Sequence, residues 1–204
     1  MQIKVNGKKI KCDPKKTLLH ILREQGVEIP TLCYQEGLKP AGRCRLCVVE
    51  VKGKLISTCD NYPSEGMEIL TNSEKVLRSR KINAELLMPD HMAKCMIENK
   101  QHDLCKIIAD LGITEVRFDP KKKYKVDLGA SVIRDDNLCI NCGRCVDVCA
   151  DVQATWAIDF AKRGHSEHVT PYCEHNLHDV ACTKCGQCAQ QCYYGALKIK
   201  EGIK

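Results

Sequence analysis

The chain has 204 residues, a formal net charge of +6 and 4% aromatic residues, yet it contains 16 cysteines. The small number of aromatic side chains argues against one large hydrophobic core. We therefore expect two or three small domains, each stabilised by a metal site or by disulfides. The N-terminus has no apolar signal segment, and no run of about 18 apolar residues occurs. We therefore expect a cytoplasmic protein without a membrane span, whose cysteines bind metal or act in redox chemistry.

The positive net charge says little about which kind of partner this chain binds. The formal value counts every cysteine as a neutral thiol, whereas a metal-bound thiolate is negative. Cluster-bound cysteines would bring the chain close to neutrality, so the positive charge is weak evidence for a nucleic-acid partner or a membrane surface, and we expect no nucleic-acid partner. The short lysine run at residues 121–123 is expected to be a solvated linker.

The first 75 residues predict a mixed unit of strands and one helix. Alternating residues on either side of Asn6-Gly7 predict a β-hairpin. Residues 17–25 have helical periodicity and end at Gly26, a typical helix C-cap. A second strand–turn–strand at residues 48–57 and a strand at residues 66–70 follow. This order predicts a small β-grasp sheet crossed by one helix.

The middle of the chain predicts helices. Ser73 is a suitable N-cap for a helix that runs to about residue 87, and Pro89 would end it. A second helix is expected over residues 103–111, before Gly112.

The end of the chain predicts little regular structure. Residues 118–131 have the composition of a linker. We expect a short strand at 132–134, a hairpin around Gly164 and a closing strand at 196–200.

The C-terminal part contains the spacing Cys-x2-Cys-x2-Cys-x3-Cys twice, in residues 139–149 and 182–192. In two-cluster ferredoxins the first three cysteines of such a run bind one [4Fe–4S] cluster, and the fourth binds the other cluster. We expect that fourth cysteine to start a helix. Structural zinc is the alternative, but zinc usually takes separated Cys-x2-Cys pairs. The predicted ligand sets are Cys139, Cys142, Cys145 and Cys192 for the first cluster, and Cys149, Cys182, Cys185 and Cys188 for the second.

A further set of cysteines lies in the N-terminal part, at Cys33, Cys44, Cys47 and Cys59. Two cysteines three residues apart on a loop, with one cysteine well before and one well after, can hold a [2Fe–2S] cluster, as in plant-type ferredoxins. Arg43 and Arg45 flank this loop and could offset the negative charge of a cluster. Buried structural cysteines are the alternative interpretation.

The order of these motifs resembles a known family. The segments PTLCYQEGLKPAGRCRLCVVEV, HMAKC, CINCGRCVDVCADVQ and CTKCGQCAQQCYYGAL follow one another. They resemble the iron–sulfur N-terminal region shared by [FeFe] hydrogenases, the large iron–sulfur subunit of complex I and NAD-dependent formate dehydrogenases. The resemblance implies an α+β chain with a β-grasp [2Fe–2S] ferredoxin-like domain at residues 1–76. A short helical segment at 77–125 and a two-cluster bacterial-type ferredoxin domain at 126–204 would follow.

The family has a further cluster site between these domains, of the form His-x3-Cys-x2-Cys-x5-Cys, which holds a [4Fe–4S] cluster. Here His91 and Cys95 match, Cys105 matches after one additional residue, and Glu98 replaces the second cysteine. A carboxylate is a harder ligand than a thiolate and suits cluster iron less well. We therefore expect one [2Fe–2S] and two [4Fe–4S] clusters, with a further [4Fe–4S] at this degenerate site as the less favoured alternative.

The resemblance also implies a function. The relatives continue into a catalytic domain, whereas this sequence ends at Lys204, and it contains no phosphate loop or dinucleotide fingerprint. We expect a non-catalytic electron-transfer subunit of an oxidoreductase complex. Complexes of this kind are often electron-bifurcating. The subunit would relay single electrons between a flavin/NAD(P)-binding partner subunit and a separate catalytic subunit or ferredoxin. A free-standing soluble ferredoxin and a zinc-stabilised binding module are the alternatives.

Overall fold

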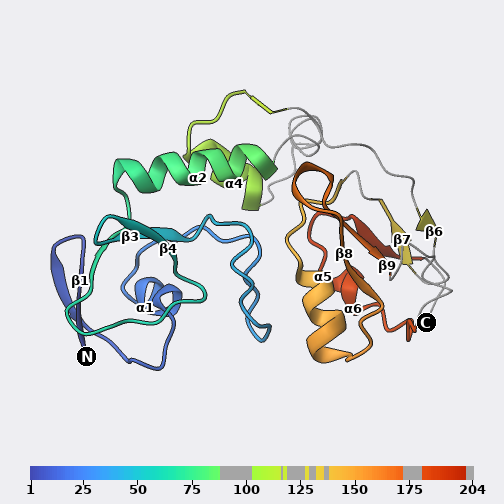
Figure 1. Cartoon of the computed structure of the whole chain (residues 1–204), viewed down its shortest axis with the longest axis horizontal. Helices are drawn as coiled ribbons and strands as arrows, with labels where there is room; N and C mark the ends of the chain where they lie inside the picture. The colour runs from blue at the N-terminus through green and yellow to red at the C-terminus, as the bar shows by residue number, and fades with distance from the viewer. Residues whose placement is uncertain are drawn as a thin grey trace.

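The computed structural model describes residues 1–87, 103–115, 117–118, 127–128, 132–135, 138–171 and 181–200. In Figure 1 the N-terminal sheet with helix α1 lies on the left, and the C-terminal strands with helix α5 lie on the right. Helices α2 and α4 lie above the N-terminal sheet. The predicted α+β class is confirmed. No described helix combines the length and the hydrophobicity that crossing a bilayer requires.

The N-terminal unit is a five-stranded mixed sheet in the order β2-β1-β5-β3-β4. Strands β1 and β5 run parallel, and every other neighbouring pair runs antiparallel. The two hairpin turns, at Asn6-Gly7 and Lys52-Gly53, have positive φ at both residues, as type I′ turns require. The strands are β1 (Gln2–Val5), β2 (Lys8–Lys11), β3 (Val48–Val51), β4 (Lys54–Ser57) and β5 (Glu68–Leu70).

Helix α1 (Leu18–Glu24) closes one face of this sheet. It buries four aliphatic side chains in a core that also contains Ile3, Val49 and Ile69. The Thr17 side chain accepts a hydrogen bond from the His20 backbone N–H, which satisfies one of the free donors at the helix start. The predicted β-grasp arrangement therefore follows from two local hairpins and one amphipathic helix.

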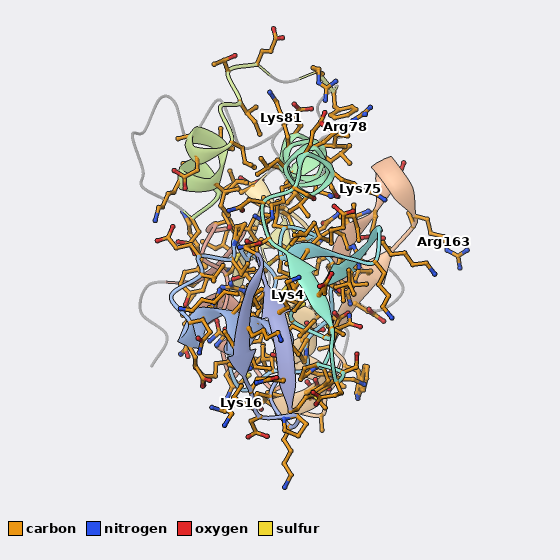
Figure 2. The ribbon with its side chains drawn as sticks, turned by 90° about the vertical axis from the view of Figure 1, so that its left-hand side faces the viewer. Lys4, Lys16, Lys75, Arg78, Lys81 and Arg163 are labelled. Atoms are coloured by element: carbon orange, nitrogen blue, oxygen red, sulfur yellow. The ribbon has the colours of Figure 1, made fainter. Side chains whose placement is uncertain are left out.

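Helix α2 (Glu74–Leu87) packs on strand β3 and on helix α4 (Asp103–Asp110). Ser73 caps α2 as predicted, because its Oγ accepts a hydrogen bond of 3.3 Å from the backbone N–H of Val76. The outer face of α2 is basic and exposed, and it carries Lys75, Arg78 and Lys81 (Figure 2).

The C-terminal unit has a three-stranded sheet in the order β10-β7-β6 and a separate hairpin of β8 and β9. Its helices are short: α5 (Arg144–Asp147) continues into a π-helical turn, η2 (Val148–Val152), and α6 (Gln187–Gln190) lies near the end. A 3₁₀ turn, η3 (Gly164–Ser166), lies within the β8–β9 connection. The strands are β6 (Asp127–Leu128), β7 (Val132–Arg134), β8 (Ile158–Ala161), β9 (His168–Pro171) and β10 (Leu197–Ile199).

Two expectations are corrected here. Strand β6 lies inside the segment that was predicted to be only linker, and it pairs with β7. Helix α5 begins directly after Gly143 and already contains Cys145, so the fourth cysteine of the run does not start it; Cys149 lies within η2. The reason is that Gly143, at φ +84°, reverses the chain before the third cysteine.

Candidate functional site

The N-terminal cysteines form two close pairs. The sulfurs of Cys33 and Cys44 lie 3.4 Å apart, and those of Cys47 and Cys59 lie 3.5 Å apart. Two thiolates on one tetrahedral metal with bonds of about 2.3 Å would lie roughly 3.8 Å apart. Two pairs at nearly this spacing suit two irons, each held by two cysteines, so the four residues fit a [2Fe–2S] cluster.

The β3–β4 hairpin sets the second pair. Cys47 directly precedes β3, and Cys59 follows β4 by one residue. Between them Thr58 donates two hydrogen bonds to the Cys47 carbonyl, from its backbone N–H at 3.2 Å and from its hydroxyl at 2.9 Å. The strand register therefore brings together two sulfurs that are twelve residues apart in the sequence.

Within each pair, the two cysteines have different pKa values. A hydrogen bond between the two sulfurs lets one thiol keep the proton, which lowers the pKa of Cys44 and of Cys47. The same sharing, followed by burial, raises the pKa of Cys33 and of Cys59. Each pair thus offers one thiolate readily, which is the form that binds metal.

A buried cation lies close to this set. Arg80 of α2 is 4% exposed, and its Nη2 donates a hydrogen bond of 2.8 Å to the Val48 carbonyl. Its Nε has no hydrogen-bond partner among the described residues. Burial lowers the pKa of Arg80 to about 10, while the neighbouring Cys47 acts in the opposite direction. A buried guanidinium is costly without a counter-charge, and a negatively charged cluster at Cys47 would supply one.

The eight cysteines of the C-terminal repeat line two separate cavities. The first predicted set, Cys139, Cys142, Cys145 and Cys192, surrounds one cavity together with Tyr194 and Leu197. The second predicted set, Cys149, Cys182, Cys185 and Cys188, surrounds the other cavity together with Thr155 and Gln187. In each cavity three cysteines come from one run and the fourth comes from the other run. This crossed arrangement and the purely thiol donor set fit two [4Fe–4S] clusters.

Hydrogen bonds to sulfur are present in both cavities. The Leu197 backbone N–H donates to the Cys192 sulfur at 3.4 Å, and the Asn141 backbone N–H donates to the Cys139 sulfur at 3.4 Å. In the second cavity the hydroxyl of Thr155 lies 3.2 Å from the Cys149 sulfur. Hydrogen bonds of this kind stabilise thiolate ligands and tune cluster potentials.

The two C-terminal sets differ in exposure. Cys145 of the first set is buried, and burial raises its pKa well above the ordinary value. In the second set burial raises the pKa of Cys188 to about 12, but Cys185 is exposed to solvent. The second set therefore includes a cysteine that is exposed to solvent, whereas no cysteine of the first set is.

The three cysteine sets follow one another through continuous apolar packing. Cys33 and Cys44 share one buried cluster with Tyr194, and Cys142 packs against the same cluster. A second apolar cluster contains Cys145 and is contacted by cysteines of both C-terminal sets. The N-terminal site thus borders the first C-terminal site, which in turn borders the second.

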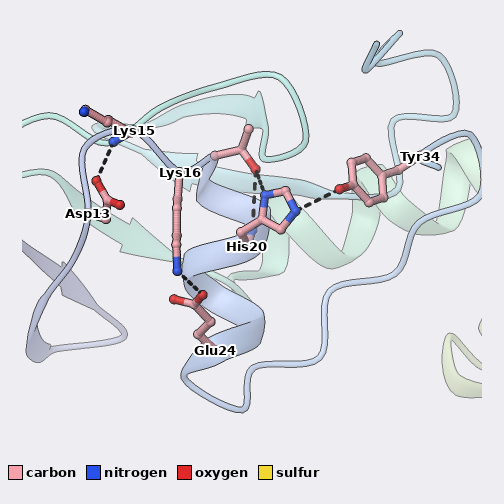
Figure 3. Close-up of polar contacts among 7 residues, drawn as sticks. Asp13, Lys15, Lys16, His20, Glu24 and Tyr34 are labelled. Carbon is pink, nitrogen blue, oxygen red and sulfur yellow. Dashed lines mark hydrogen bonds and ion pairs between the residues drawn. The ribbon is translucent and has the colours of Figure 1, made fainter. Parts of the chain in front are cut away.

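A pair of hydrogen bonds made by the His20 ring, close to the N-terminal cysteines, was not predicted from the sequence. The ring of His20 lies 2.8 Å from the hydroxyl of Thr17 through Nδ1 and 2.8 Å from the hydroxyl of Tyr34 through Nε2 (Figure 3). Tyr34 directly follows Cys33, so this bridge ties the cysteine loop to the first turn of α1. The only signal in the sequence was a histidine at the fourth residue of the helix predicted over residues 17–25.

The predicted middle site falls largely outside the described residues. His91, Cys95 and Glu98 are not among them, while Cys105 lies half-buried in α4. The degenerate site therefore stays a prediction. Of the remaining cysteines, Cys12 packs at the edge of the N-terminal core, and Cys173 lies outside the described residues.

Comparison with known proteins identifies two domains. Residues 1–74 match the family described as 2Fe-2S iron–sulfur cluster binding domain. Residues 138–201 match the family described as 4Fe-4S dicluster domain. The predicted cofactors, one [2Fe–2S] and two [4Fe–4S], are confirmed at the level of cluster type, and the zinc interpretation is set aside.

Relatives and one solved structure agree with this assignment. The NADP-reducing hydrogenase subunit HndD of Solidesulfovibrio fructosivorans is 36% identical over 100% of this chain and 37% of its own length. A subunit of the NADH-quinone oxidoreductase of Rhizobium meliloti (strain 1021) is 30% identical over 97% of this chain and 24% of its own length. The chain thus spans well under half the length of these curated relatives.

A chain in the crystal structure of an NAD+-reducing [NiFe]-hydrogenase in the H2-reduced state superposes with a TM-score of 0.85. Its sequence identity is 27%, over 98% of this chain and 88% of that chain. The protein is therefore an iron–sulfur protein that carries a 2Fe-2S cluster binding domain followed by a 4Fe-4S dicluster domain, similar throughout to parts of hydrogenase and NADH-quinone oxidoreductase subunits.

Proposed function

We propose that this chain is a non-catalytic electron-transfer module that relays single electrons between a flavin/NAD(P)-binding partner subunit and a separate catalytic subunit or ferredoxin. The observation that carries the proposal is the serial placement of the three cysteine sets, in which Cys44 and Cys142 meet at one apolar cluster. When bound, the clusters supply reversible one-electron chemistry. Because electron-transfer rates fall steeply with distance, neighbouring cysteine sets in one folded chain suit a relay.

The proposed partners rest on the sequence and on the relatives. NAD(P)H gives up two electrons as a hydride, so a flavin is needed to release them singly. The sequence of this chain has no dinucleotide fingerprint, so we assign that step to a partner subunit. The relatives are named as subunits of an NADP-reducing hydrogenase and of an NADH-quinone oxidoreductase, and the matched structure is an NAD+-reducing hydrogenase. These names support a nicotinamide-linked complex.

The proposal does not require a cluster in the middle segment. The N-terminal set and the first C-terminal set border each other through the cluster that contains Cys44 and Tyr194. Electrons can therefore pass between these two sites even if the degenerate site at His91, Cys95 and Cys105 holds no iron. In that case the relay has three centres.

The test is anaerobic purification of the full chain, followed by measurement of iron, acid-labile sulfide and zinc. We expect iron with matching sulfide, and EPR signals from a [2Fe–2S] and from [4Fe–4S] centres that each take up one electron. Zinc without sulfide would overturn the proposal.

Anaerobic gel filtration of native extract tests the partner assignment. We expect the chain to elute with a flavoprotein. Elution of all the chain at the size of a monomer would favour a free-standing ferredoxin.

A further inference from the structure

Two arginines cross in opposite directions between the N-terminal cysteine loop and the first C-terminal set. Arg43 directly precedes Cys44, and its Cζ lies 4.1 Å from the ring centre of Phe160 in strand β8. Its Nη2 lies 3.9 Å from Asp147 Oδ1 in helix α5. Arg43 thus extends from the [2Fe–2S] loop onto the C-terminal unit.

Arg144 makes the reciprocal connection. It lies between Gly143 and Cys145, and its Nη2 donates a hydrogen bond of 3.0 Å to the backbone carbonyl of Tyr34. Tyr34 follows the proposed [2Fe–2S] ligand Cys33, so this bond joins the two cluster loops across 110 residues of sequence. Each arginine therefore stands next to a cysteine of its own set and contacts the unit that carries the other set.

Arg144 is also a buried charge with few partners. Arg144 is 7% exposed, and its Cζ lies 4.7 Å from the ring centre of Tyr193. Among the described residues no carboxylate lies within ion-pair distance of it, and its Nε has no hydrogen-bond partner. Burying a cation in this way is costly unless a negative group compensates it.

The first [4Fe–4S] site can supply that negative group. Four thiolates give a cluster a net negative charge, which grows by one when an electron is added. Arg144 stands between Cys142 and Cys145 in the sequence, so its charge is attached to the loop that lines this cavity. Charge near a cluster is one of the factors that set its reduction potential. A fixed cation here favours the reduced form over the oxidised form.

We propose that Arg144 is a positioning residue with two roles: it clamps the [2Fe–2S] loop onto the first [4Fe–4S] site and raises the reduction potential of that [4Fe–4S] cluster. Arg43 completes the clamp from the other side. The inference rests on the proposed electron-transfer function and assigns to this chain the residues that hold its first two centres in fixed register.

The test compares three variants of the full chain, purified anaerobically with their clusters. Arg144→Gln removes the charge, and Arg144→Lys keeps the charge but loses the planar fork. Arg163→Gln is the control, because it removes the same charge from the same unit at an exposed position that points away from the body of the protein (Figure 2). Iron and sulfide are measured first, so absence of clusters in the unaltered chain is read as failure of the proposed function.

EPR-monitored reductive titration then gives the potential of each centre. We expect Arg144→Gln to lower the equilibrium constant for reducing one [4Fe–4S] centre by about tenfold, which is ~59 mV for a one-electron couple. Arg144→Lys should keep that constant within about threefold, and Arg163→Gln should leave it unchanged, because an exposed charge is screened by solvent. An unchanged potential in Arg144→Gln with all clusters present would overturn the electrostatic role.

Hydrogen exchange tests the clamp without relying on the clusters' redox signals. Both Arg144 variants should increase exchange in residues 33–44, because the bond to the Tyr34 carbonyl is lost or weakened, whereas Arg163→Gln should not. Equal protection of residues 33–44 in all four proteins would overturn the positioning role. If Arg144→Gln fails to retain the first cluster, exchange in Arg144→Lys decides the positioning role, and titration of Arg144→Met, which also removes the charge, decides the electrostatic role.

Discussion

Replacing Gly143 by alanine should damage the contact between the two cluster units more than the equivalent change at Gly186. The two glycines occupy the same place in the two cysteine runs, one residue after the second cysteine. Both have left-handed backbone, with φ of +84° at Gly143 and +73° at Gly186. Alanine at either position should therefore cost about 1–2 kcal/mol from backbone strain alone.

The surroundings of the two glycines differ. A Cβ at Gly143 would lie 2.6 Å from Nε and 2.9 Å from Cδ of Arg43, so the arginine would have to leave its position. A Cβ at Gly186 would lie 3.1 Å from the terminal Cδ1 of Ile199, which can rotate away. Losing the Arg43–Phe160 contact costs about 0.5–2 kcal/mol.

The long ion pair to Asp147 adds at most about 1 kcal/mol. We therefore expect about 1.5–5 kcal/mol in total for Gly143→Ala, against about 1–2 kcal/mol for Gly186→Ala.

The assay is anaerobic thermal unfolding of the cluster-loaded chain, followed through the visible absorbance of the clusters. At ~2–4 °C per kcal/mol for a chain of this size, Gly143→Ala should lose several degrees more than Gly186→Ala. Hydrogen exchange of residues 40–44 should increase only in Gly143→Ala. Equal losses of stability, with unchanged exchange around Arg43, would refute the reasoning that Arg43 fills the space above Gly143.

Three other outcomes follow from the proposed sites. Cys59→Ser should abolish the [2Fe–2S] EPR signal and leave the [4Fe–4S] signals, whereas Cys12→Ser, outside every proposed ligand set, should leave all signals intact. Leu104→Ala, at a fully buried position of α4, should cost about 2–5 kcal/mol in a denaturant titration; a cost below about 1 kcal/mol would mean that α4 does not pack as described. Iron analysis should give about ten atoms per chain with an empty middle site and about fourteen with a filled one, and only in the second case should His91→Ala lower the count.

Much of the fold is written in local sequence. Asn6-Gly7 specifies a tight hairpin because both residues of a type I′ turn need positive φ, which Asn and Gly tolerate best, and Gly53 supplies the second such position at the Lys52-Gly53 turn. The predicted helix over residues 17–25 corresponds to α1, since a hydroxyl cap and an apolar stripe act within a few residues of each other. The predicted helix over residues 103–111 corresponds to α4 for a similar reason, with Gly112 just beyond its end at φ +60°.

The cysteine spacing carried similar information about the candidate sites. A loop with cysteines three residues apart can wrap only a compact centre, so the crossed ligand sets could be predicted without knowing the strand pairings. The start of α5 was misplaced, because a reversal at Gly143 and a π-helical turn at Cys149 depend on how the loop closes around its cavity. Strand β6 was not predicted because it has only two residues, too few to form a recognisable alternating pattern.

Sequence alone therefore determined the kinds of cluster and the two cluster-binding folds, and it predicted the cysteines that would hold the clusters, since each depends on short-range spacing. Only the tertiary structure decided how the sites are joined. The Arg144–Tyr34 hydrogen bond, the Arg43–Phe160 contact and the burial of Arg80 beside Cys47 link residues that are far apart in the chain. Such contacts depend on which faces of the folded units pack together, and no local pattern of residues encodes that choice.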